Sequence, residues 1–244
     1  VVAIVEIAPL LSSSAIPQPA KIGLALLTTV IVFPWVSKLG YAIPANIVDY
    51  FLLVAGEVLI GVIIGFFLAL IYSVFQVAGE FFAFQMGFGA SSVFDPLAQV
   101  EVPLMGQYLN VVAMLVFVTI GGFQKIFISG VYASFKSLTV PDILSSRKYL
   151  LTFFVGSIAK LFENALTISF PILGTLFIIS VCLGLLAKAA PQMNLLMLGF
   201  PISITVTYLF LFLILPFLGD AASRLISASF RELEGLYRSL GGAS

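Results

Sequence analysis

Residues 189–219 read AAPQMNLLMLGFPISITVTYLFLFLILPFLG, a stretch of 31 residues without a charged side chain. About 20 apolar residues are enough for a helix to cross a bilayer, so this stretch can span one. A second long apolar helix is expected at about 150–188, with a kink at Pro171. The residues between them, 189–194, contain a proline that stops a helix. The pattern predicts a helical hairpin.

The rest of the chain has the same apolar character. Of its 244 residues, 61% are hydrophobic and 9% are charged, whereas soluble domains carry about 25% charged residues. Three more charge-free runs are long enough to cross a bilayer, at 58–79, 102–124 and 164–187. Shorter runs near the N-terminus are interrupted by prolines. The composition predicts an all-α integral membrane protein built from long, broken helical hairpins.

Composition also argues against several classes of function. The net charge is zero, so no basic surface for nucleic acid is expected. The chain has no histidine and one cysteine, which removes the usual proton shuttle, metal ligands and serine-activating base. We therefore expect no enzymatic activity, no cofactor and no metal site. The chain begins at Val1 within an apolar stretch, and we expect further residues to precede it.

The segment 79–96 reads GEFFAFQMGFGASSVFDP and differs from the runs around it. Its three glycines make an uninterrupted helix unfavourable, since glycine costs about 1 kcal/mol relative to alanine. We expect the apolar helix before it to occupy 50–78 and the segment itself to be broken. Irregular backbone at membrane depth must be buried in protein or line a cavity. Its five phenylalanines and one methionine fit either ordinary aromatic packing or a narrow apolar throat that excludes water and ions.

Acidic residues within apolar runs suggest a second possibility. Glu57 and Glu80 have no obvious partner along their own helix, and such acids are functional candidates by default. They favour a self-contained, proton-coupled transporter of a small solute. The inverted repeat typical of such transporters is not evident in the sequence. Between these acids, Gly61 and Gly65 form a small-xxx-small pattern, which predicts a close approach of two helices.

The C-terminal residues 220–244 predict an amphipathic helix on a surface. Arginines recur every seven residues at 224, 231 and 238. Apolar residues recur with spacings of four and three at Ile226, Phe230, Leu233, Tyr237 and Leu240. One face is therefore apolar and another is basic, as in interfacial or packing helices.

Several short motifs, in order along nearly the whole chain, carry a resemblance to a known family. They are AKIGLA at 20–25, AGE at 78–80, QMGFG at 85–89, FDP at 94–96, LLAKAAPQMN at 185–194 and GFP at 199–201. With these motifs the chain resembles the FliR family, the integral export-gate proteins of bacterial type III secretion. The flagellar and virulence-secretion members are not distinguished. One departure is Phe123 after Gly121 and Gly122, where relatives often have a histidine.

The resemblance implies a non-enzymatic subunit that forms and plugs a conduit for exported polypeptides. Its implied partners are FliP-like and FliQ-like subunits and FlhB, in the basal body at the bacterial inner membrane. Residues 1–140 would be similar to FliP and 141–219 to the FliQ hairpin, followed by 220–244. The family's assembly is a helical cone raised largely out of the bilayer. Apolar helices could therefore be covered by partner subunits instead of lipid.

The resemblance also implies roles for individual residues. The pore plug or seal would consist of Phe84, Met86, Phe88 and Phe94, with Gly87 and Gly89 as the hinge and Glu80 and Asp95 as support. A cytoplasmic turn near FlhB would contain Lys188, Pro191, Gln192, Met193 and Asn194.

Overall fold

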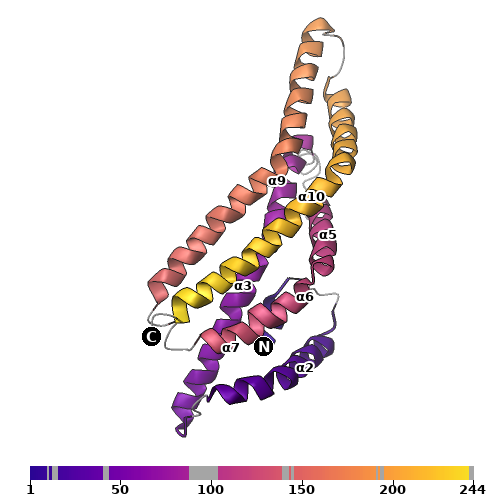
Figure 1. The fold of residues 1–244 in the computed structure, drawn as a ribbon. Coiled ribbons are helices and arrows are strands. Elements are labelled where there is room, and N and C mark those ends of the chain that lie inside the picture. The colour runs from indigo at the N-terminus through magenta and orange to yellow at the C-terminus, as the bar shows by residue number, and fades with distance from the viewer. Residues whose placement is uncertain are drawn as a thin grey trace. The chain divides into compact units, whose positions relative to one another are not determined.

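The computed structural model describes residues 1–9, 11–12, 16–40, 44–87, 104–138, 143, 146–190, 192 and 195–241. In these residues every regular element is a helix, which confirms the predicted all-α class. The elements are α1 (Val2–Ile7), α2 (Gln18–Val36), the 3₁₀ turn η1 (Ser37–Leu39), α3 (Ile47–Met86), α5 (Leu104–Thr119), α6 (Gly122–Lys125), the π-helix η2 (Ile126–Tyr132), α7 (Ala133–Ser137), α9 (Arg147–Ala189) and α10 (Leu195–Gly241) (Figure 1).

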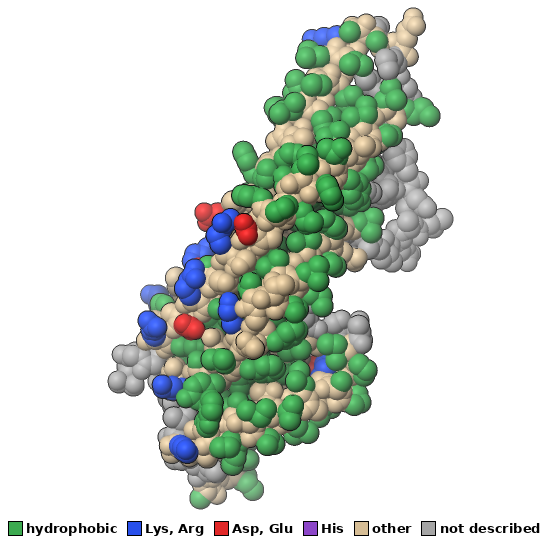
Figure 2. Space-filling model, turned by 45° about the vertical axis from the view of Figure 1, so that its right-hand side comes forward, with side chains coloured by type: hydrophobic (Ala, Val, Ile, Leu, Met, Phe, Trp, Pro, Cys, Tyr) green, Lys and Arg blue, Asp and Glu red, His purple; other side chains and the backbone are tan. Residues whose placement is uncertain are grey.

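Among the described residues, four helices are long and apolar enough to cross a membrane. They are α2, α3, α9 and the part of α10 from Met197 to Leu240. Helix α5 and the following helical stretch Gly122–Ser137 pass the same test together, but they are bent by 74° at the break between them. Hydrophobic side chains accordingly cover much of the surface (Figure 2).

The bend after α5 comes from two glycines. Gly121 has a φ of 69°, in the left-handed region that favours glycine. At Gly122, a Cβ atom would overlap the ring of Phe117. The charge-free run at 102–124 therefore does not form one helix: α5 ends at Thr119, and the chain turns before α6.

Two predicted helix boundaries were wrong. Helix α3 does not end at residue 78 but continues through Gly79 to Met86. The C-terminal residues do not form a helix of their own, because α10 runs without interruption from Leu195 to Gly241. Propensity underestimated both lengths, since tertiary packing supports most of the stability of a helix in a protein.

The chain divides into two compact units, each assembled from separate stretches of sequence. Unit 1 comprises Val1–Tyr72, Phe117–Ala159 and Arg224–Ser244, and unit 2 comprises Ser73–Val116 and Lys160–Ser223. Each unit thus contains residues from both sides of the predicted boundary near residue 140. That boundary concerns similarity to FliP and FliQ, and it stays a prediction.

In unit 1, α1 packs against α3 at Gly61 and Gly65. A Cβ atom on Gly61 would lie 2.9 Å from Cβ of Ala3, and one on Gly65 would lie 2.8 Å from Cβ of Ile7. These distances are shorter than real contacts, so only glycine allows α1 to lie this close to α3. The small-xxx-small pair therefore lies at a helix crossing within the chain itself.

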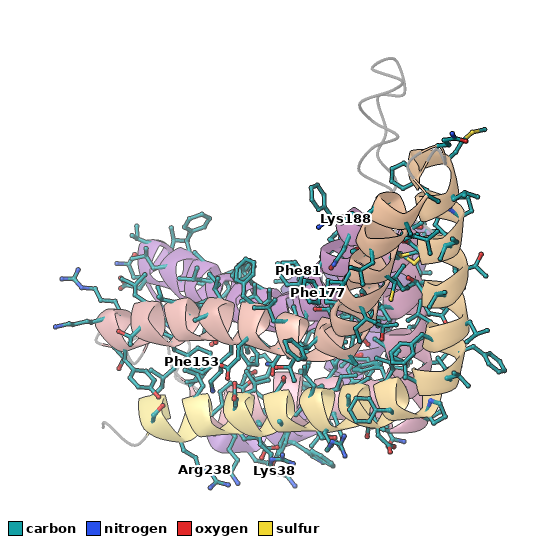
Figure 3. The ribbon with its side chains drawn as sticks, turned by 90° about the horizontal axis from the view of Figure 1, so that it is seen from above. Lys38, Phe81, Phe153, Phe177, Lys188 and Arg238 are labelled. Atoms are coloured by element: carbon teal, nitrogen blue, oxygen red, sulfur yellow. The ribbon has the colours of Figure 1, made fainter. Side chains whose placement is uncertain are left out.

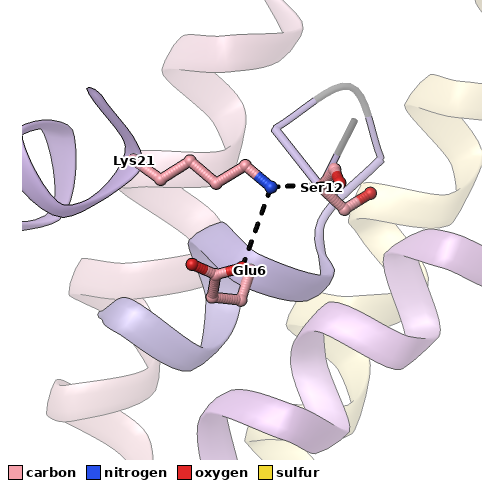
Figure 4. Close-up of polar contacts among 3 residues, drawn as sticks. All are labelled: Glu6, Ser12 and Lys21. Carbon is pink, nitrogen blue, oxygen red and sulfur yellow. Dashed lines mark hydrogen bonds and ion pairs between the residues drawn. The ribbon is translucent and has the colours of Figure 1, made fainter. Parts of the chain in front are cut away.

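A buried lysine joins α1, the turn after it and α2. The Lys21 ammonium is 3.8 Å from Oε2 of Glu6, and it donates a hydrogen bond of 3.1 Å to the carbonyl oxygen of Ser12 (Figure 4). The Lys21 side chain is 6% exposed. Because a buried charge is costly unless paired, these two contacts are what allow lysine at this position.

Aromatic contacts tie the N-terminal part of α9 to α3 within unit 1. The rings of Phe67 and Phe153 have centroids 5.2 Å apart, and those of Phe66 and Phe154 are 5.6 Å apart (Figure 3 labels Phe153). Aromatic pairs at these separations attract beyond their area of burial. They hold α9 alongside the half of α3 that precedes Tyr72.

The C-terminal part of α10 packs against α6 and η2. The Ser129 hydroxyl donates to Oε1 of Glu234 at 2.9 Å, and the Tyr237 hydroxyl lies 3.5 Å from the carbonyl oxygen of Gly130. Tyr237 and the four other apolar residues of the predicted stripe are buried, whereas the three arginines are exposed. The stripe is therefore a packing face inside unit 1.

Candidate functional site

The candidate site begins in unit 2, in the last turns of α3. Phe82 and Met86 are four residues apart on one helix face, and both are 0% exposed. Phe84 lies between them in the sequence and is 80% exposed. The end of α3 therefore has one face in the core of unit 2 and an aromatic ring on the opposite side.

Gly87 ends α3. Its φ of 92° lies in the left-handed region, and its N–H donates a hydrogen bond of 3.1 Å to the carbonyl oxygen of Phe84. A Cβ atom on Gly87 would overlap the ring of Phe200, which belongs to α10. Both the backbone conformation and the neighbouring ring thus require glycine here.

A second glycine contact lies two turns earlier on α3. A Cβ atom on Gly79 would overlap the backbone of Gly106 in α5. A Cβ atom on Gly106 would lie 2.9 Å from the carbonyl oxygen of Gln76. Gly79 therefore does not break α3, as propensity suggested, but allows α5 to touch its backbone.

The other candidate region is the turn between α9 and α10. The N–H of Ala190 donates a hydrogen bond of 2.9 Å to the carbonyl oxygen of Leu186 and closes the last turn of α9. Lys188 is exposed in that turn, where a cation interacts favourably with the helix dipole (Figure 3). Cδ1 of Leu183 lies 3.6 Å from the Cβ position of Gly199, so the two arms of the hairpin are in contact beside the turn.

Some predicted site residues lie outside the described residues. These are Phe88, Gly89, Phe94 and Asp95 of the plug segment, and Pro191, Met193 and Asn194 of the turn. Those described are Glu80, Phe84, Lys188 and Gln192, all exposed, together with the buried Met86 and with Gly87. Met86 is a core residue in this arrangement, so a sealing role would require it to leave its packing.

Two residues of the site were not predicted from the sequence. Phe200 was quoted only as part of the GFP motif, and Gly106 was not noted. Neither contact could be derived from local pattern, since each joins residues far apart in the chain. The sequence held one indication for Phe200: its motif, GFP, occurs in the same ordered series as QMGFG. Motifs of one series can lie together in the fold.

The described residues contain no cluster of three or more histidine, cysteine, aspartate or glutamate side chains that could hold a metal ion. The exposed groups of the site are the aromatic ring of Phe84, the carboxylate of Glu80, the amide of Gln192 and the ammonium of Lys188. Such groups can pack against apolar surface, form hydrogen bonds and bind carboxylates.

The fold defines an all-helical protein with several helices able to cross a membrane. By sequence the chain belongs to the bacterial export proteins, family 1, whose family model matches residues 1–229. This membership places the candidate site in a protein of bacterial export.

Three similar proteins carry the same name. The chain is 31% identical to the flagellar biosynthetic protein FliR of Pectobacterium carotovorum subsp. carotovorum, over 100% of this chain and 92% of that protein. It is 28% identical to FliR of Escherichia coli strain K12, over 98% of this chain and 90% of that one. For FliR of Bacillus subtilis strain 168 the identity is 27%, over 96% and 90%.

Proposed function

We propose that this chain is a non-enzymatic core subunit of the flagellar type III export gate, in the bacterial inner membrane. In this function it helps to form the conduit for exported polypeptides and to close it before export begins. Family membership and the FliR relatives support the export role. The relation of residues 1–140 to FliP and of 141–219 to FliQ belongs to the same proposal.

The observation that carries the closing role is the exposure of Phe84 at the end of α3. An aromatic ring that is 80% exposed needs apolar surroundings, which lipid, another subunit, a conduit wall or an exported chain can supply. The contact between Gly87 and Phe200 holds the backbone beside Phe84. The ring of Phe84 therefore projects from unit 2 at a fixed position. A row of such side chains across a conduit excludes water and ions.

The proposed partners are FliP-like and FliQ-like subunits and FlhB. Large exposed hydrophobic side chains on the described helices support an assembly with other subunits or lipid. On the hairpin of unit 2 they include Phe170, Phe177, Met197, Leu209 and Phe212. The turn with Lys188 and Gln192 is proposed to face the cytoplasmic mouth and FlhB.

Co-purification and ion leak test this function. We expect the tagged chain to co-purify with FliP-like and FliQ-like subunits in mild detergent. In cells, Phe84→Ala should increase ion leak through the assembled gate. Phe51→Ala is the matched control, since that ring is 72% exposed near the other end of α3.

Two results would contradict the proposal. One is a chain that purifies alone and catalyses proton-coupled uptake of a small solute, which would favour a transporter. The other is an assembled gate whose leak and export are the same with Phe84→Ala as without it.

A further inference from the structure

Helices α3 and α5 touch through their backbones at Gly79 and Gly106. A Cβ atom on Gly79 would overlap backbone atoms of Gly106 and Met105, and one on Gly106 would meet the Gln76 carbonyl oxygen at 2.9 Å. Side chains usually separate packed helix axes by 8–10 Å. At this crossing the backbones of Gly79 and Gly106 touch directly, and the nearest side-chain atom to the Cβ position of Gly106 is Cγ of Gln76, at 3.2 Å.

The crossing lies near the C-terminal end of α3 and the N-terminal end of α5. Met86 is the last residue of α3 and Leu104 is the first residue of α5. Gly79 is therefore two turns before the end of α3, and Gly106 is in the first turn of α5. The contact joins the two helices next to the points where residues 88–103 leave one and enter the other.

A second contact holds the same end of α3 from another direction. The ring of Phe200 on α10 lies where a Cβ atom on Gly87 would be. Unit 2 thus fixes α3 against α5 at Gly79 and against α10 at Gly87. The contact at Gly79 is backbone against backbone, so it cannot adjust by a change of side-chain rotamer.

The other glycines of unit 2 show that this closeness is specific. Gly174 and Gly184, both in α9, have nothing within 4 Å of a Cβ position. An alanine at either place should fit, and it should favour the helix slightly. Gly199 and Gly219 have only ordinary contacts, at 3.6 and 3.9 Å. Among the described glycines of unit 2, the tight contacts are therefore at Gly79, Gly87 and Gly106.

We propose that Gly79 and Gly106 are positioning residues of the gate's seal, a role that rests on the proposed function. Their contact holds the end of α3, with Phe84, and the start of α5 at a fixed separation. The two helices stay in contact while the gate exports, so ions do not pass between them. Neither glycine touches the exported polypeptide.

The test compares alanine substitutions in the assembled flagellar gate. Gly79→Ala and Gly106→Ala force the helices apart, whereas Gly174→Ala and Gly184→Ala are the matched controls. Ion leak, polypeptide export and co-purification with partner subunits are measured for each. We expect leak to rise about fivefold to a hundredfold in the first pair, since the fraction of gates with an open crossing grows with the packing free energy that an added methyl group removes.

If the two glycines had a purely structural role, their substitution would not raise ion leak without also reducing co-purification or export. Raised leak with normal co-purification and continued export supports the positioning role. Leak equal to that of the Gly174→Ala and Gly184→Ala gates overturns it. If the chain does not co-purify with the partner subunits at all, the proposed function fails instead, so the two failures are distinguishable.

Hydrogen exchange on the unmodified gate decides the matter even if neither variant accumulates. Amides at 76–83 in α3 and at 108–112 in α5, which follow the first turn of that helix, should exchange among the slowest in the chain, also during export. Fast exchange of these amides in the exporting gate would mean that α3 and α5 separate there, and it would overturn the inference.

Discussion

The ring of Phe200 occupies the space that a Cβ atom on Gly87 would take. This relationship connects the end of α3 with the first turns of α10, two helices separated by more than a hundred residues of sequence. It also joins two of the motifs on which the resemblance to the export-gate family rests, QMGFG and GFP. The helix end that carries Phe84 is therefore positioned by the hairpin.

Gly87→Ala should destabilise unit 2 by about 2–4 kcal/mol, because it combines an unfavourable left-handed backbone with a clash against the ring. Thermal unfolding of the detergent-purified protein measures the loss. Gly40→Ala is the matched control, since Gly40 has a φ of 70° but nothing within 4 Å of its Cβ position. That variant should lose only about 1 kcal/mol.

The double variant Gly87→Ala, Phe200→Ala separates the two causes. Removal of the ring should recover the part of the loss that comes from the clash and leave the backbone part. If the double variant is as unstable as the sum of the single variants, the two residues are not in contact.

How far the sequence predicts this fold depends on the range of the interactions involved. The stripe from Ile226 to Leu240 was predictable, because helical periodicity marks a buried face within a single segment. The face it packs against, on α6 and η2, was not, since nothing in the stripe encodes its partner. Helix propensity wrongly predicted that α3 ends before Gly79, for the same reason. The residue that explains this glycine, Gly106, lies on another helix.

The candidate site was predictable only in part. An accumulation of phenylalanine and glycine at 79–96 marks an unusual segment, and the ordered family motifs gave it a role. Sequence could not distinguish the buried faces of α3 from the exposed one, because all are apolar. Met86 and Phe84 have similar hydrophobicity, yet one is in the core and the other is 80% exposed. Only tertiary packing separates them.

Lys21→Met should destabilise unit 1 by about 1–3 kcal/mol, since it leaves the Glu6 carboxylate and the Ser12 carbonyl without their shared cation. Glu6 is 35% exposed, so water compensates for part of the loss. Glu6→Gln should therefore cost less than Lys21→Met. Chemical or thermal unfolding measures both, with the exposed Lys38→Met as control. Equal stability of Lys21→Met and Lys38→Met would show that the buried contacts contribute nothing.

Leu233→Ala should cost about 2–5 kcal/mol, the usual range for emptying a filled core position. Leu233 is 0% exposed on the packing face of α10. Arg231→Ala, two residues earlier on the exposed face, should change the stability by less than about 0.5 kcal/mol. Unfolding of the purified variants measures the difference. Similar small effects would indicate that the C-terminal part of α10 is a surface anchor and not a part of the unit 1 core.

Gly65→Val should displace α1 from its contact with α3, because the added branched side chain would clash with Ile7 and the backbone of Ala3. Maleimide labelling in detergent reports this change when the exposed Cys182 is first replaced by serine and a cysteine takes the place of Ile4, which is buried in the intact unit. The cysteine should be protected in the parent chain and react quickly with Gly65→Val. Gly156→Val is the matched control, since nothing lies within 4 Å of the Cβ position there. Equal protection in both variants would mean that α1 does not depend on the small residue beneath it.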